Sequence, residues 1–313
     1  MLQLRVIVVA CLVVAAAAQD TGKKTYTYKT VGGLDIQADV HRLPGEEARP
    51  AIFWIHGGAL IMGSRNGPRA DQLRRYLDAG FVVVSIDYRL APETKLAGIL
   101  DDVADAWRWV QTEGPNLFRV DPKRVAVVGH SAGGYLTLTT GYRLRPMPRA
   151  LVSYYGYGDI AADWYGKPDP FYLQQAAVTV EEARQVVGTT PLAEPPRGNR
   201  RGRFYLYTRQ QGLWPQEVAG FDPAVVPKVF DLYCPARNVT KTYPPTLLLH
   251  GDVDTDVPFS QSEQMAAELK RHGVEHELIR ISGGGHGFDG NLQDPQAAAA
   301  FDKALAFLKR QTR

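Results

Sequence analysis

The stretch Arg124-Val-Ala-Val-Val-Gly129-His130-Ser131-Ala132-Gly133 decides the fold. Its first half is a short apolar run typical of a buried parallel strand, and its second half matches Gly-x-Ser-x-Gly. A helical pattern begins near Ala132, so the chain is expected to turn sharply at Ser131. Such a turn would explain the glycines on either side of the serine, because side chains at those positions would collide with neighbouring elements. An incidental serine in a Gly-rich connection is the alternative, and the rest of the chain must decide between them.

Apolar runs alternate with helical patterns along most of the chain. After a hairpin over 25–31 and 34–42, the expected strands span residues 50–55, 81–86, 124–128, 150–154, 245–250 and 275–281. The expected helices span residues 70–79, 96–112, 132–142, 260–272 and 295–309. This order predicts a mostly parallel, doubly wound α/β sheet with helices on both faces. Ligands bind such sheets at the edge where the strands end.

Residues 156–243 interrupt this alternation with a stretch rich in Pro, Gly, Arg and aromatic residues. The stretch is too long for a simple loop, and we interpret it as a cap subdomain inserted between two parts of the core, 19–155 and 244–313. Some of its aromatic residues must form the cap's own core, and the others are candidates to line an acyl or sugar-binding cleft. The candidates are Trp164, Tyr165, Tyr205, Tyr207 and Trp214. The arginines between Arg197 and Arg209 either recognise an anion or form a solvated basic loop.

The N-terminal residues predict export. Arg5 precedes an uninterrupted apolar run from Val6 to Ala18, which is typical of a cleaved signal peptide over residues 1–18. The run is shorter than the ~20 residues of a spanning helix, although an uncleaved anchor is the alternative. We therefore expect a secreted or periplasmic protein without stable membrane association after cleavage. Cleavage leaves one cysteine, Cys234, which makes no intramolecular disulfide.

The composition is that of an ordinary globular protein. The 313 residues are 45% hydrophobic and 22% charged, with a net charge of +3. So small a net charge gives no reason to expect nucleic acid or a membrane surface as a partner. The chain shows neither Cys/His metal spacing nor a phosphate-binding glycine loop, so we expect no metal and no cofactor.

Two polar loops follow expected strands and supply partners for the serine. One spans residues 251–258 and the other, 283–288, contains His286. A serine is a weak nucleophile unless a base accepts its proton and a carboxylate orients that base. Ser131, an aspartate and His286 occur in the chain order of one hydrolase architecture. The residues alone leave the carboxylate open, because the first of these loops carries three alternating candidates: Asp252, Asp254 and Asp256.

A further motif, His56-Gly57-Gly58-Ala59, follows the expected strand at 50–55. The tetrahedral intermediate of acyl transfer carries an oxyanion that needs donors already in place. The backbone N–H groups of Gly58, Ala59 and Ala132 are the candidates for this oxyanion hole. A plain Gly-Gly turn is the alternative. We expect the stretch 87–93 to brace the loop through charged hydrogen bonds.

With these motifs, the chain from about residue 25 to 309 resembles the α/β-hydrolases. It is similar to the hormone-sensitive-lipase-like esterases, with an acid loop closer to the prolyl-oligopeptidase-like group. It differs from the lipase-like set in having Ala59 where a third glycine is usual, and the mixture is similar to feruloyl and acetyl-xylan esterases. The resemblance implies that Asp254 is the acid, followed by Asp256 and then by Asp252 or Asp289.

The expected function is that of an exported serine carboxylic-ester hydrolase acting on a small or carbohydrate-linked ester. In this interpretation Ser131 is the nucleophile, His286 the base and Asp254 the residue that orients it. Two alternatives stay open. A serine exopeptidase would agree with the acid loop, and a catalytically inactive hydrolase-fold binding module would keep the fold without the chemistry.

Overall fold

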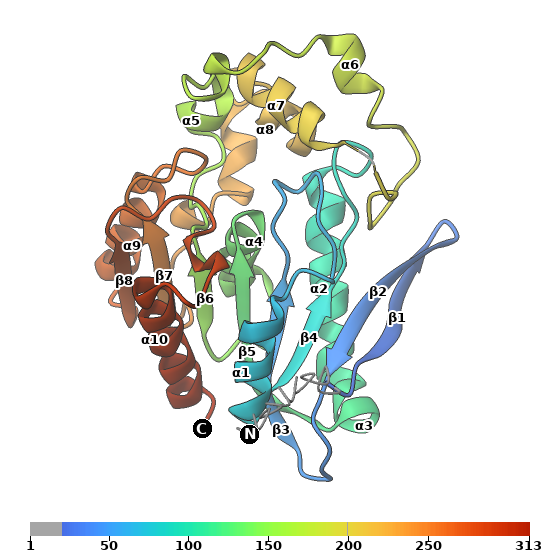
Figure 1. Cartoon of the computed structure of the whole chain (residues 1–313), viewed down its shortest axis with the longest axis vertical. Coiled ribbons are helices and arrows are strands. Elements are labelled where there is room, and N and C mark those ends of the chain that lie inside the picture. Colours follow the sequence, from blue (N-terminus) through green and yellow to red (C-terminus); the bar gives the residue numbers. More distant parts are fainter. Residues whose placement is uncertain (1–20, 199) are drawn as a thin grey trace, which may run out of the picture.

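The computed structural model describes residues 21–198 and 200–313, and the expected signal peptide lies outside them. Within these residues, eight strands form one sheet in the order β1-β2-β4-β3-β5-β6-β7-β8 (Figure 1). They are β1 (Lys24–Val31), β2 (Leu34–His41), β3 (Arg49–Ile55), β4 (Val82–Ile86), β5 (Val120–His130), β6 (Leu151–Tyr154), β7 (Thr246–Gly251) and β8 (His276–Ile281). The hairpin β1–β2 and the pair β2–β4 are antiparallel, and the other pairs are parallel. The predicted α/β fold class is confirmed. The hairpin expected at 25–31 and 34–42 is also present, with β1 at the edge of the sheet and β2 next to it.

Helices cover both faces of the sheet (Figure 1). Helices α1 (Ala70–Asp78) and α10 (Pro295–Gln311) pack on one face, against a core that includes Ile52 and Trp54 of β3. The intervening residues of β3, Phe53 and Ile55, belong to the core on the opposite face. That face carries α2 (Leu96–Thr112), the short α3 (Gly114–Phe118), α4 (Ala132–Arg143) and α9 (Ser260–Arg271). The continuous apolar runs in the sequence thus reflect strands that are buried on both sides.

Residues 156–243, which we call the cap segment, contain helices and loops but no strand among the residues that the structure describes. The helices are α5 (Asp163–Gly166), η1 (Tyr172–Gln174), α6 (Val180–Arg184), α7 (Gly202–Gln211), α8 (Trp214–Ala219), η2 (Pro227–Leu232) and η3 (Pro235–Arg237). Helices α5, α6, α7 and α8 lie at one end of the sheet, at the top of Figure 1, whereas η3 contacts α4 and α9. Such short pieces give no sustained helical period in the sequence. No helix of the described residues is long and apolar enough to cross a membrane.

The cap segment is bonded to the loop that follows β3. Arg201 is 2% exposed, and its guanidinium binds the Glu93 carboxylate at 2.7 Å as well as the backbone carbonyls of Ile61 and Ala91. The indole N–H of Trp214 donates to the carbonyl of Ala59 at 3.0 Å. Two buried side chains of the cap segment therefore hold residues 59–61 in place.

The buried Arg201–Glu93 ion pair allows the attachment of the cap segment to the core to be tested. The substitution Arg201→Met leaves a buried carboxylate without its cation, which we expect to lower the free energy of unfolding by about 3–5 kcal/mol. The matched substitution Arg200→Met removes an exposed arginine and should change it by less than about 0.5 kcal/mol. Urea unfolding followed by circular dichroism measures both. Equal effects of the two substitutions would contradict the attachment.

Candidate active site

The turn between β5 and α4 places Ser131 in an unusual backbone conformation, with φ 56° and ψ −122°. Its backbone N–H donates to the carbonyl of Tyr154 at the end of β6, at 2.9 Å. The first turn of α4 passes so close to β3 that a Cβ on Gly133 would lie 2.1 Å from the carbonyl oxygen of Ile55. The glycine at position 133 is therefore required by packing.

Ser131, His286 and Asp254 form one hydrogen-bonded chain. The Oγ of Ser131 lies 3.0 Å from Nε2 of His286, and Nδ1 of His286 lies 2.8 Å from Oδ2 of Asp254. Asp254 follows β7 and its side chain is fully buried, whereas His286 lies on the loop after β8 and is 25% exposed. The other oxygen of Asp254 accepts the backbone N–H groups of Asp256 and Val257, at 2.8 and 3.0 Å. The structure thus brings together the three residues named from the sequence.

The electrostatics of this chain favour a basic imidazole. Burial alone would lower the pKa of His286, but the hydrogen bond to Asp254 and the nearby charge of Asp256 raise it above its usual value. Burial alone would raise the pKa of Asp254, yet hydrogen bonds from His250 and His286 hold it well below its usual range. Asp254 is therefore an ionised carboxylate that stabilises a protonated His286.

Sequence reasoning missed the part played by His250. This fully buried residue in β7 has Nε2 at 3.0 Å from the carbonyl of Val257 and at 3.3 Å from Oδ2 of Asp254, while its Nδ1 lies 2.7 Å from the hydroxyl of Ser262. His250 therefore contacts the same carboxylate oxygen of Asp254 that binds His286. The sequence signal for this role was a histidine at the end of an otherwise apolar strand. A histidine at such a position is common in proteins for structural reasons alone.

The other candidate carboxylates have different partners. Asp256 lies on the Ser131 side of the imidazole, with Oδ2 at 3.3 Å from Nε2 of His286. Its Oδ1 accepts hydrogen bonds from three side chains of the cap segment: Tyr172, Tyr205 and Arg209. Asp252 binds Arg280 at 2.8 Å, and Asp289 lies 3.0 Å from Nε2 of His130. Within the described residues, Asp254 alone among these four has a hydrogen bond to Nδ1 of His286.

The loop 57–59 has its carbonyl groups turned into the protein. The carbonyl of Gly57 accepts from Nδ1 of His56 at 2.7 Å, that of Gly58 accepts from two N–H groups of the following turn, and that of Ala59 accepts from Trp214. Gly58 and Ala59 reach this geometry with φ of 105° and 55°. Among the residues described, no protein group accepts a hydrogen bond from the N–H groups of Gly58 or Ala59. Those N–H groups remain available beside Ser131.

His56 supports this loop as a neutral side chain. Burial lowers its pKa to about 4, and its ring stacks on Tyr88 with centroids 4.0 Å apart. The hydroxyl of Tyr88 donates to the backbone carbonyl of His56 at 2.9 Å. Together with the Ala91 N–H, which donates to the carbonyl of Leu60 at 2.8 Å, these contacts show the stretch 87–93 bracing the loop.

A cleft of about 320 Å³ lies in front of Ser131. It is lined by Gly57, Gly58, Ala59, Met62, His130, Ser131, Tyr155, Tyr205, Asp256 and His286. Of the aromatic residues expected to line a substrate cleft, Tyr205 lines this one, whereas Trp164, Tyr165, Tyr207 and Trp214 are absent from its lining. Three of these four stack on one another, Tyr165 on Trp214 at 3.9 Å and Trp164 on Tyr165 at 3.7 Å between ring centroids. Tyr155 lines the cleft as well.

The arginines of the cap segment differ in their surroundings. Arg209 is fully buried, bound to Asp169 and Asp256 and within 4.7–5.7 Å of four aromatic ring centroids. Arg201 is buried against Glu93, whereas Arg197 and Arg200 are exposed. The two buried arginines are internal connectors, so the cluster does not form one anion-binding surface. An aromatic-rich stretch with arginine can therefore indicate a buried cation as well as a ligand cleft.

Known proteins agree with this architecture. A family model described as the alpha/beta hydrolase fold matches residues 52–290. The chain belongs to the α/β-hydrolases. The family predicted from the sequence motifs is thereby confirmed.

Individual proteins also resemble this α/β-hydrolase. It is 29% identical over 310 residues to the non-reducing polyketide synthase Preu6 of Preussia isomera, and the match covers 88% of the chain but 14% of that protein. Two solved structures share the fold. A Staphylococcus aureus protein of unknown function has a TM-score of 0.78 at 23% identity, with 93% of this chain and 100% of that one covered. Carboxyl esterase 2 of the fungus Tuber melanosporum has a TM-score of 0.69 at 20% identity, covering 93% and 87%.

The raised pKa of His286 depends on Asp254 and can be measured directly. In the Asp254→Asn variant of this α/β-hydrolase, we expect the pKa of His286 to fall by about one to three pH units. The adjacent negative charge is lost in this variant, while the burial of His286 persists. NMR titration of the histidine ring protons reports this pKa. The matched substitution Asp252→Asn, at a carboxylate bound to Arg280, should leave it unchanged. An unchanged pKa in the Asp254 variant would refute the pairing.

Proposed function

We propose that this α/β-hydrolase is a serine carboxylic-ester hydrolase that works through an acyl-enzyme. The observation that carries the proposal is the Ser131–His286–Asp254 chain, with distances of 3.0 and 2.8 Å, beside two unpartnered backbone N–H groups of the loop 57–59. A nucleophile, a base, an orienting carboxylate and oxyanion donors are the parts that acyl transfer requires.

In the proposed first step, Ser131 Oγ attacks the ester carbonyl carbon while His286 Nε2 accepts the hydroxyl proton. Asp254 holds Nδ1–H and stabilises the imidazolium that forms. The N–H groups of Gly58, Ala59 and Ala132 stabilise the negative oxygen of the tetrahedral intermediate, and each such donor is worth about 3 kcal/mol of barrier. The imidazolium then protonates the leaving alcohol, which departs as the intermediate collapses to the acyl-enzyme.

In the second step, water attacks the acyl-enzyme with the same residues in reversed roles. His286 Nε2 takes a proton from the water, and the oxyanion again lies against the backbone donors. Collapse of the second tetrahedral intermediate returns the proton to Ser131 Oγ and releases the carboxylic acid. The charge of Asp256 beside His286 supports the imidazolium in both steps.

The size of the cleft supports a small acyl group. Its volume is about 320 Å³, near the lower end of small-molecule sites. It is bordered by Tyr205 of the cap segment and by Asp256 of the loop after β7. The Tuber melanosporum neighbour is a carboxyl esterase by name, which agrees with an ester rather than a peptide substrate. We include export in the proposal on the strength of residues 1–18 alone, and carbohydrate-linked esters among the possible substrates.

Removal of the nucleophile tests the mechanism. The substitution Ser131→Ala should lower kcat for p-nitrophenyl acetate by roughly 10⁴–10⁶-fold and should abolish labelling by a fluorophosphonate. Ser260→Ala, at an exposed serine of α9, serves as the control and should keep the wild-type rate. A wild-type protein that is neither labelled nor active would favour an inactive binding module, and preference for an aminoacyl anilide would favour an exopeptidase.

The mechanism also fixes the direction of the pH dependence. His286 must be neutral to accept the serine proton, and its pKa is raised above its usual value of about 6.5. We therefore expect kcat/KM for p-nitrophenyl acetate to fall as the pH drops through a midpoint above 6.5. In the Asp256→Asn variant the midpoint should move to lower pH, because a neighbouring negative charge is removed. A profile that is flat between pH 5 and pH 9 would contradict the role of His286.

A further inference from the structure

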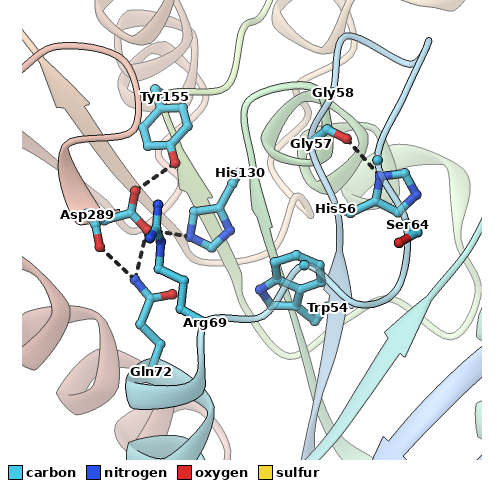
Figure 2. Close-up of a pocket in the computed structure, with 12 residues that line it drawn as sticks. Trp54, His56, Gly57, Gly58, Ser64, Arg69, Gln72, His130, Tyr155 and Asp289 are labelled. Atoms are coloured by element: carbon cyan, nitrogen blue, oxygen red, sulfur yellow. Dashed lines mark hydrogen bonds and ion pairs between the residues drawn. The ribbon is translucent and has the colours of Figure 1, made fainter. Parts of the chain in front are cut away.

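A second cavity, of about 270 Å³, lies beside the cleft that contains Ser131. It shares Gly57, Gly58, His130 and Tyr155 with that cleft, and it extends away from the cap segment toward α1. Figure 2 shows Arg69, Gln72, His130 and Asp289 on one side of it and Trp54 and His56 on the other. We call it the polar cavity.

The polar cavity and the cleft meet at the proposed oxyanion loop. A Cβ on Gly57 would lie 2.7 Å from the carbonyl oxygen of His130 and 3.3 Å from the Cβ of Ser131, so the loop passes directly over the serine turn. An ester carbonyl at Ser131 has two substituents, one on the acyl and one on the alcohol side. The geometry therefore allows one substituent to lie in the cleft and the other in the polar cavity.

Asp289 does not offer its charge to a ligand. One carboxylate oxygen accepts from the hydroxyl of Tyr155 at 2.6 Å, and the other accepts from the amide of Gln72 at 2.9 Å and lies 3.0 Å from Nε2 of His130. The residue is 2% exposed. Its hydrogen-bonding capacity is used in joining the walls of the cavity, so a cationic ligand finds no free acceptor there.

Arg69 offers the opposite charge without a carboxylate partner. The residue is exposed, its Nη1 donates to the backbone carbonyl of Gly290 at 2.8 Å, and no carboxylate oxygen of the described residues lies within 4.0 Å of it. Other arginines of the same helix region are paired, Arg74 with Asp78 and Arg75 with Asp302. A Cβ on Gly290 would lie 2.7 Å from Nη2 of Arg69, so a glycine there makes room for the guanidinium.

A second polar group in the same cavity lacks a partner. His130 is 9% exposed, and its Nδ1 has no hydrogen-bond partner among the described residues. Since Nε2 of this ring faces the Asp289 carboxylate, Nδ1 is left as an acceptor that a donor group of a ligand would satisfy. The Arg69 guanidinium, whose partner among the described residues is a backbone carbonyl and not a carboxylate, fits a ligand carboxylate, which binds arginine through paired charged hydrogen bonds.

We propose that the polar cavity is a subsite for a carboxylate carried by one of the two substituents of the ester, with Arg69 as its binding residue. This inference rests on the proposed esterase function and specifies its substrate class as acidic esters. Neutral polar substituents are the competing occupants, and the amide member of each substrate pair below represents them.

Two matched substrate pairs test both sides of the ester bond. The alcohol side is tested with 4-acetoxybenzoate against 4-acetoxybenzamide, and the acyl side with mono-p-nitrophenyl adipate against its terminal amide. Each pair exchanges a carboxylate for a neutral amide of similar size. For at least one pair, we expect the wild-type kcat/KM to favour the carboxylate by about tenfold or more, mainly through KM, since a paired charged hydrogen bond is at stake.

The variant Arg69→Met should bring that ratio to one or below, whereas Arg74→Met, which removes an arginine paired with Asp78 on the outside of α1, should keep the wild-type ratio. Raising the salt concentration should also reduce the preference. Hydrolysis of all four esters without preference for a carboxylate, or a preference that Arg69→Met leaves intact, overturns the subsite while the esterase function stands. Hydrolysis of none of them, nor of p-nitrophenyl acetate, overturns the proposed function itself.

Discussion

The pairing of β3 with β5 sets the geometry on which the whole site depends. Ile55 pairs with Gly129 in a parallel register, so the two strands end side by side and their following residues emerge next to each other. The strand pairing alone therefore brings the loop 57–59 over Ser131. The tight packing of Gly133 against the carbonyl of Ile55 keeps α4 close and forces the positive φ at Ser131. A register shift of one residue would separate the serine from its neighbouring N–H groups and turn β3 over.

The orientation of the loop carbonyls matters as much as the position of the loop. A peptide group that points its carbonyl into the protein must point its N–H the other way, because the two groups are antiparallel across a planar unit. The N–H groups of Gly58 and Ala59 belong to the peptide units whose carbonyls are those of Gly57 and Gly58. His56 donates to the first of these carbonyls, and the N–H groups of Ile61 and Met62 donate to the second. The donors of the cleft are thus oriented by hydrogen bonds made to the carbonyls of their own peptide units. Since these bonds are already made, no rearrangement is needed when negative charge develops on a substrate.

Much of this arrangement could be predicted from the sequence, and the reason is local. The strands are continuous apolar runs such as 81–86, and the polar turns follow them directly. The order of Ser131, Asp254 and His286 along the chain can be read from the sequence itself. The short helices of the cap segment were not predicted, because four to ten residues interrupted by proline and glycine carry little periodic signal. Trp214 was a candidate either for a substrate cleft or for the core of the cap, and only the fold reveals the carbonyl of Ala59 as its partner. The polar cavity could not be predicted for the same reason, since its lining comes from β3 and the segment between β3 and α1, from α1, from the end of β5, from the residue after β6 and from the segment after β8.

Arg209 joins the cap segment to the loop that carries Asp254. Its guanidinium is enclosed by aromatic rings and binds Asp256, which lies beside the imidazole of His286. The cap segment is consequently not an interchangeable module. A cap transplanted from another protein would leave Asp256 as an uncompensated charge next to His286 unless it brought its own cation, and a change made to alter substrate choice would also alter the basicity of the imidazole. Asp256 borders the cleft and also lies beside the imidazole of His286, so a substitution of Asp256 would change both surroundings at once.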